Sequence, residues 1–246
     1  IIFGSEFRAL LAHPDVSREV EPRAIDNYLS FLCVPAPMTA FRSIRKLRPG
    51  HWLRWKDGKV ETRRYWLPDF SKKIKISEAE AIEETTRLLR EATKIRLISE
   101  VPLGAFLSGG VDSSIVAALM AEVSDRSVKT FSIGFEEQDY SELKYARRVA
   151  EHIGAEYNEF VVRPNALEVL PVLVEHYGEP YADSSAIPTY YVAKETRKHV
   201  TVALNGDGGD ESFAGYERYA AMKLAERYQR IPRPLRTSVI AKMAGL

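Results

Sequence analysis

Residues 108–114 read Ser-Gly-Gly-Val-Asp-Ser-Ser and join two apolar segments. The adjacent Gly109 and Gly110 let the backbone approach a ligand closely. Ser113 and Ser114 lie where a helix is expected to begin, with its first amides unpaired. Such a turn binds anions, because both the free N–H groups and the helix dipole favour negative charge. The pattern therefore predicts a phosphate site, with an ordinary turn and an Asp or Ser helix cap as the simpler alternative.

The residues after the glycines indicate which kind of phosphate site this is. The P-loop of kinases and GTPases has a Lys directly after its last glycine, but Val111 and Asp112 follow Gly110 here. We therefore do not expect γ-phosphoryl transfer. A carboxylate beside phosphate favours Mg²⁺, which proteins hold through carboxylates together with phosphate oxygens.

A second loop, residues 205–211, reads Asn-Gly-Asp-Gly-Gly-Asp-Glu and carries three carboxylates and three glycines in seven residues. Taken alone, it is equally well explained as a solvated acidic turn. Its position after an apolar segment makes a site the better explanation, provided that both loops lie at one edge of the same sheet.

The elements that must position these loops begin at residue 77. Ser77 and Glu80 form a capping box, and apolar residues recur at helical spacing behind it, so we expect a helix that packs on a sheet. Strands are predicted at residues 102–107, 130–135, 157–162 and 200–204, and helices at 113–123, 143–153, 167–177 and 188–198. Alternating strands and helices predict an α/β fold with a doubly wound parallel sheet and right-handed crossovers. Ligands bind beyond the carboxyl ends of such strands, so the loops after Leu107, Phe135 and Leu204 should converge.

The first third of the chain has a different pattern. Short helices are predicted at residues 7–12 and 24–31. Residues 51–55 and 60–65 flank Asp57-Gly58, which is a strong signal for a β-hairpin.

Residues 108–114 resemble the PP-loop of the ATP pyrophosphatases, which split ATP between the α and β phosphates, adenylate a substrate and release pyrophosphate. Residues 101–107 (Val-Pro-Leu-Gly-Ala-Phe-Leu) and 205–211 resemble the glutamine-dependent asparagine synthetases. The resemblance covers the whole chain. It implies the C-terminal remnant of an α+β, class II glutamine amidotransferase (glutaminase) domain at residues 1–66, a linker at 67–76, and an ATP-binding domain, truncated at its C-terminus, at 77–246.

The resemblance also implies a site for ATP and Mg²⁺. Asp112 and Asp210 are the expected metal ligands, and Asp207 stands where the family has an acidic residue, often Glu, beside the acyl adenylate and the ammonia. Asp207 is therefore assigned as general base or as the group that orients the amine. The expected nucleotide-binding residues are Leu107, Ser108, Gly109, Gly110, Asp112, Ser113, Ser114, Ile133, Asn205 and Gly206, with adenine near the last three.

The expected reaction is ATP-dependent amide formation. A carboxylate, that of the aspartate side chain, is adenylated with release of pyrophosphate, and ammonia derived from glutamine then displaces the adenylate. Alternatives are another acyl-adenylating amidotransferase, such as a β-lactam synthetase or an enzyme of polysaccharide or natural-product amidation, a silent nucleotide-binding module, or a tRNA-modifying pyrophosphatase. Well-studied asparagine synthetases place an Arg where this chain has only small residues between Asp183 and Pro188, so the acid stays open. Asp183 either caps the following helix or lines the acid pocket.

The family's glutaminase nucleophile is an N-terminal Cys, whereas Cys33 is internal and is expected to be a small buried apolar residue. We therefore expect that nucleophile upstream of Ile1 and no glutaminase activity from this chain alone.

The composition limits which classes of binding partner we expect. Lys plus Arg number 35 and Asp plus Glu 34, so there is no basic field for nucleic acid. No apolar run is long enough for a membrane span, the five His lack ligand spacing, and a single Cys fits a reducing compartment. We expect a cytoplasmic enzyme acting on small molecules, with a homodimer as an assembly left open.

Overall fold

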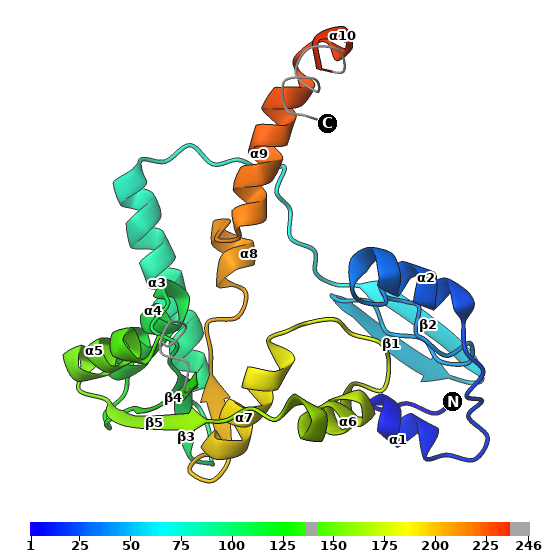
Figure 1. Ribbon diagram of the computed structural model, residues 1–246, viewed down its shortest axis with the longest axis horizontal. Coiled ribbons are helices and arrows are strands. Elements are labelled where there is room, and N and C mark those ends of the chain that lie inside the picture. The colour runs from blue at the N-terminus through cyan, green and yellow to red at the C-terminus, as the bar shows by residue number, and fades with distance from the viewer. Residues whose placement is uncertain (136–141, 237–246) are drawn as a thin grey trace. The chain divides into compact units, whose positions relative to one another are not determined.

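A computed structural model of the chain describes residues 1–135 and 142–236 (Figure 1). These residues form two compact units. The first combines Ile1–Thr85 with Val161–Glu195, and the second combines Thr86–Phe160 with the chain from Thr196 onward. The predicted division into residues 1–66, 67–76 and 77–246 stays a prediction.

The second unit is built on a four-stranded sheet in the order β5-β4-β3-β6. The strands are β3 (Leu103–Phe106), β4 (Lys129–Phe135), β5 (Glu156–Val162) and β6 (Val202–Leu204). β3 pairs in parallel with both β4 and β6, in a register that places Ala105 opposite Thr130 on one side and Leu204 on the other. This order confirms the predicted doubly wound fold, and it places the reversal of strand order between β3 and β6. Ligands bind at such a switch point.

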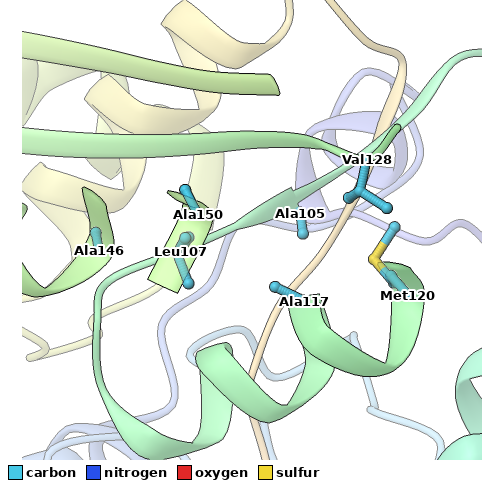
Figure 2. Close-up of a cluster of buried hydrophobic side chains, with 7 residues drawn as sticks. All are labelled: Ala105, Leu107, Ala117, Met120, Val128, Ala146 and Ala150. Carbon is cyan, nitrogen blue, oxygen red and sulfur yellow. The ribbon is translucent and has the colours of Figure 1, made fainter. Parts of the chain in front are cut away.

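The core of this unit lies between the sheet and two helices, α4 (Val111–Val123) and α5 (Leu143–Ile153). Figure 2 shows Ala117 and Met120 of α4 directed toward Ala105 and Val128. Ala146 and Ala150 of α5 join the same cluster with Leu107, all of them buried. Small side chains let both helices pack closely under the first loop. Gly154 ends α5 with φ +65°, so the helix has the predicted bounds of residues 143–153.

Helix α3 (Glu78–Arg96) begins with the predicted capping box: Ser77 N–H donates to Glu80 Oε2 at 2.8 Å, and Glu80 N–H donates to Ser77 Oγ at 3.3 Å. The expectation that its apolar face packs on the sheet is wrong for much of its length. Leu88 is 50% exposed and Ile95 is 62% exposed. Helical periodicity reveals that a face is apolar, but it does not reveal what covers that face.

The first unit contains α1 (Phe7–Leu11), α2 (Pro22–Phe31), and a hairpin of β1 (His51–Lys56) and β2 (Lys59–Arg64). Asp57 and Gly58 both have positive φ, 50° and 73°, which is the conformation of a type I′ hairpin turn. Helices α6 (Ala166–Tyr177) and α7 (Ala186–Thr196) belong to this unit and share an apolar cluster around Val169 and Leu173.

Two predicted boundaries differ by two residues for local reasons. Helix α7 begins at Ala186 because Pro188 fits the first turn of a helix. Strand β6 begins at Val202 rather than 200, because the amide of Val200 is bonded to Thr196 O at the end of α7.

After β6 the chain forms α8 (Gly209–Phe213), α9 (Glu217–Gln229) and α10 (Arg233–Leu235). Among residues 1–135 and 142–236, no helix combines the length and apolar character needed to cross a bilayer.

Candidate active site

The loop from Ser108 to the start of α4 is held by its own hydroxyl groups. Ser108 Oγ lies 2.9 Å from Ser113 Oγ and accepts from Gly110 N–H at 3.2 Å. Ser113 and Ser114 both donate to Gly110 O, at 3.2 and 2.6 Å. The N-cap of α4 is Gly110, which has no side chain to accept from the first amides of the helix. Those amides therefore present a positive helix end to the space beyond the sheet.

Leu107 supports this loop from below. Its side chain is 1% exposed, its N–H donates to Phe131 O at 2.9 Å, and its carbonyl accepts from Ser132 Oγ at 2.5 Å. Ile133, one residue further along β4, is half-buried at the same carboxyl edge of the sheet. The loop therefore starts from a rigid strand end.

The acidic loop after β6 packs directly on the first loop. A Cβ on Gly206 would lie 2.7 Å from Ser113 N and 2.9 Å from Asp112 Cβ. The Asp112 carboxylate lies against Gly209, the residue before Asp210. The Asp210 carboxylate in turn lies against Gly215, whose N–H donates to Asp210 O at 3.0 Å. The structure thus brings the two predicted loops together at the switch point.

Asp207 is held by its neighbour Asn205. Asn205 Nδ2 donates to Asp207 Oδ2 at 2.7 Å, and Asp207 N–H donates to Asn205 Oδ1 at 3.3 Å. Asp207 is exposed, whereas Asp112 and Asp210 are half-buried. Within the two paired loops, the Asp207 carboxylate is therefore more exposed to solvent than those of Asp112 and Asp210.

Comparisons with known proteins show the family of the chain. The family model described as "Asparagine synthase" matches residues 84–245, and the one described as "Glutamine amidotransferase domain" matches residues 1–66. The chain belongs to the asparagine synthase family.

Two curated relatives from this family match nearly all of the chain. "Asparagine synthetase [glutamine-hydrolyzing] 1" of Bacillus subtilis is 37% identical over 98% of the chain, which spans 38% of that relative. "Putative asparagine synthetase [glutamine-hydrolyzing] 2" of Methanocaldococcus jannaschii is 36% identical over 96% of the chain, which spans 46% of it. The chain thus spans less than half the length of these relatives. Among solved structures, the NH3-dependent NAD synthetase of Campylobacter jejuni matches 55% of the chain and 60% of its own, with TM-score 0.38 and 15% identity.

The part of the chain that the structure describes offers few side chains that could bind the predicted metal ion. Across residues 1–135 and 142–236, no three His, Cys, Asp or Glu side chains gather closely enough to form a metal centre. Asp112 and Asp210 supply two carboxylates at most. Such a pair suits Mg²⁺, which keeps several waters and takes further ligands from substrate phosphates.

The second unit has two hollows, and they differ in their relation to the paired loops. One, of about 700 Å³, is lined by Pro102, Leu103 and Val128 at the amino ends of the strands, opposite the loops. The other, of about 690 Å³, is a groove between α4 and α5 that includes Gly109 and Ser114. Only the second touches the PP-loop.

Asp183 lies just before Ala186, the first residue of α7, and its role as a helix cap stays a prediction. It accepts from Ser185 N–H at 2.8 Å. Hydrogen bonds from Ser185, that of the side chain first and that of the backbone second, hold the Asp183 pKa below its usual value. A role for this segment in binding the acid stays a prediction.

Gly109 is predicted to be the least replaceable glycine of the PP-loop. Its φ is +88°, and a Cβ there would lie 2.6 Å from Ala146 N and 2.7 Å from Tyr145 Cβ. Gly109→Ala should lower the free energy of unfolding by more than about 2 kcal/mol, because a clash adds to the roughly 1–2 kcal/mol of left-handed strain. Urea-induced unfolding measures the loss.

The matched control is Gly154→Ala. Gly154 has φ +65° but nothing within 4 Å of its Cβ position, so only the strain of about 1–2 kcal/mol should remain. Equal losses in the two variants would contradict the close packing of the loop on α5.

Sequence reasoning did not select Tyr216, whose side chain bonds to Glu211 at the end of the acidic loop. Tyr216 OH donates to Glu211 Oε1 at 2.8 Å. This bond is the first cause that lowers the Glu211 pKa below its usual 4.5 and raises the Tyr216 pKa to about 12. An aromatic residue five positions from a Glu carries no local signal for such a bond.

The pair predicts a pH dependence. Because the Glu211 pKa is lowered in the folded state, its contribution to stability is present above the unfolded pKa of 4.5 and is lost as pH falls through the folded value. Tyr216→Phe should raise the Glu211 pKa toward 4.5, as followed by NMR titration of the side-chain carboxyl carbon. Tyr219→Phe, whose ring lies 5.9 Å from that of Tyr216, is the control and should leave it unchanged.

Proposed function

We propose that the chain is part of a glutamine-dependent enzyme that uses ATP to adenylate a carboxylate and converts the acyl adenylate to an amide. The observation that carries the proposal is the packing of the acidic loop on the PP-loop, with the Asp112 carboxylate against Gly209. Two loops far apart in sequence thereby bring carboxylates and a helix N-terminus to one sheet edge. This combination suits a nucleotide whose pyrophosphate leaves as an anion.

The residues present fit ATP with Mg²⁺. A Cβ on Gly206 would fill the space in front of Ser113 N, so glycine keeps the two loops in close contact. We assign Asp112 and Asp210 to Mg²⁺, which neutralises phosphate charge when bound. We assign the backbone of residues 108–114 to the phosphates, and Ile133, Asn205 and Gly206 to the adenine side.

In the first step the acid's carboxylate attacks the α-phosphorus, and the α–β bridging bond breaks with its electrons passing to pyrophosphate. Negative charge grows on the leaving group, so the N–H groups at the start of α4 stabilise the transition state more than the ground state. In the second step ammonia attacks the acyl carbon, AMP leaves, and one proton must be removed from nitrogen. Asp207, oriented by Asn205, is assigned to that proton or to the amine itself.

The proposed acid is the aspartate side chain, giving asparagine, and the proposed nitrogen source is glutamine. The names of the Bacillus and Methanocaldococcus relatives support both. The uncharged run from Ser184 to Ile187 favours a second candidate, amidation of a different acid in the same way, because it offers no cation for a second carboxylate.

The test uses the full-length protein. Exchange of labelled pyrophosphate into ATP is measured with aspartate and with a panel of other acids, and amide is measured with ammonia and with glutamine. We expect exchange only with the correct acid, loss of exchange when EDTA removes Mg²⁺, and no release of inorganic phosphate from ATP. Acid-independent exchange or γ-phosphate release would contradict the proposal.

A further inference from the structure

The stretch from Glu175 to Ala182, at the end of α6 and beyond, contacts the N-terminal part of the chain at four points within the first unit. Arg8 lies 3.7 Å from Glu175, in a pair that is mostly exposed. Phe7 packs on Gly178, which ends α6 with φ +68°. Ala182 N–H donates to Leu32 O at 2.9 Å. Glu179 makes the remaining contacts.

Glu179 is the buried centre of this contact. Its side chain is 9% exposed, one carboxylate oxygen pairs with Lys46 Nζ, and the other accepts from Ala40 N–H at 3.1 Å. Lys46 Nζ also donates to Val34 O at 2.7 Å. Ala40 and Val34 are themselves 5% and 3% exposed. Both oxygens of this buried carboxylate are thus paired, one with the half-buried Lys46 ammonium and the other with the buried Ala40 amide.

The two ends of this ion pair belong to different family regions. Lys46, Ala40 and Val34 lie in the stretch that matches the glutamine amidotransferase domain, residues 1–66. Glu179 lies in the stretch that matches asparagine synthase, residues 84–245. From Glu179 the chain continues through α7 and β6 into the acidic loop at residues 205–211.

We propose that Glu179 is a positioning residue that, with Lys46, anchors the synthetase segment between α6 and α7 on the amidotransferase part and so couples ammonia production to amide formation. The inference rests on the proposed function. Ammonia that escapes into water at neutral pH becomes ammonium, which has no lone pair for attack on an acyl carbon. A segment that loosens from its anchor is therefore expected to waste glutamine.

Burial distinguishes this pair from the other ion pair at the same contact. Breaking a buried pair leaves an uncompensated charge or an unsatisfied backbone group, and the docked segment must move to relieve it. An exposed pair such as Arg8–Glu175, with side chains 66% and 69% exposed, contributes little. The two pairs give a matched comparison on one segment.

The test compares variants of the full-length protein by the ratio of glutamate released to amide formed from glutamine. In Glu179→Gln and in Lys46→Met we expect this ratio to rise about fivefold or more, while ammonia-dependent synthesis stays within about twofold of wild type. Lys46→Arg should keep the wild-type ratio, because it retains the charge and several donors. Glu175→Gln, which removes the same charge from the exposed pair, should also leave the ratio unchanged.

Hydrogen exchange gives a second readout that does not depend on enzyme activity. The amides of Ala40 and Ala182 should exchange faster in Glu179→Gln and Lys46→Met than in wild type, and unchanged in Glu175→Gln. If Glu179→Gln does not fold, Lys46→Met against Lys46→Arg carries the comparison. An unchanged ratio in folded Lys46→Met, or an equal rise in Glu175→Gln, overturns the proposal.

Failure of the proposed function can be distinguished from failure of the Glu179–Lys46 anchor. A full-length protein that forms no amide from either nitrogen source contradicts the amide-forming reaction. In that case, unchanged exchange at Ala40 and Ala182 overturns the anchor as well, whereas faster exchange supports the anchor alone.

Discussion

Replacing Asp112 by Asn in the full-length protein should reduce acid-dependent pyrophosphate exchange by at least about 10²- to 10³-fold. The Asp112 carboxylate lies at the junction of the two loops, against Gly209, where we assign it to Mg²⁺ on the leaving pyrophosphate. Asn preserves the shape of the side chain and its packing, but it removes the charge that attracts a hard cation. The measurement is isotope exchange between pyrophosphate and ATP at several Mg²⁺ concentrations.

Asp125→Asn is the control for this variant. Asp125 follows the other end of α4 and borders the hollow at the amino ends of the strands. The same loss of charge there should leave exchange unchanged. If Asp112→Asn keeps wild-type exchange and an unchanged dependence on Mg²⁺, Asp112 is not a metal ligand and the proposed site is wrong at its centre.

The local elements of the fold could be predicted from the sequence because their signals are short. The capping box at Ser77 and Glu80, the type I′ turn at Asp57-Gly58, and the end of α5 at Gly154 each depend on residues within a few positions of one another. The convergence of the two loops followed from a topological rule, since the carboxyl ends of parallel strands share one edge.

The long-range partners could not be predicted in this way. Lys46 and Glu179 are 133 positions apart, and a Glu before a Pro has no pattern that names a partner. The assignment of residues 161–195 to the first unit has the same cause, because the helical periodicity of α6 does not specify which surface it packs on. The exposed face of α3 is the converse case, in which an apolar pattern predicted burial that Leu88 and Ile95 do not have.

In the candidate site, too, some features could be predicted from the sequence and others could not. The residues of the PP-loop and the acidic loop were selected by type and spacing, but the hydrogen bonds that shape them were not. Asn205 was selected for adenine, yet its side chain is bonded to Asp207 in both directions. A side chain two residues away can hold a carboxylate only when the turn between them has the right geometry, and that geometry depends on Gly206 packing against Ser113.

Asp207→Asn should reduce amide formation by about 10²- to 10⁴-fold, the usual contribution of a general base, while leaving pyrophosphate exchange largely intact. Asp207 is exposed and faces Asn205, whereas the Asp112 carboxylate is packed on Gly209. We therefore assign the charge removed at Asp207 to the second step, in which nitrogen attacks the acyl carbon. The two rates to compare are exchange with the acid substrate present and product formation at saturating ammonia.

Asp207→Glu is the matched control, because it keeps the charge and adds one methylene, as in the family members that carry Glu. It should retain most of the amide-forming rate if the role is to accept a proton, since a longer side chain still reaches the amine. If Asp207→Asn lowers exchange as steeply as synthesis, Asp207 acts with Asp112 and Asp210 on the phosphates. The division of labour within the acidic loop would then be wrong, although the site itself would remain.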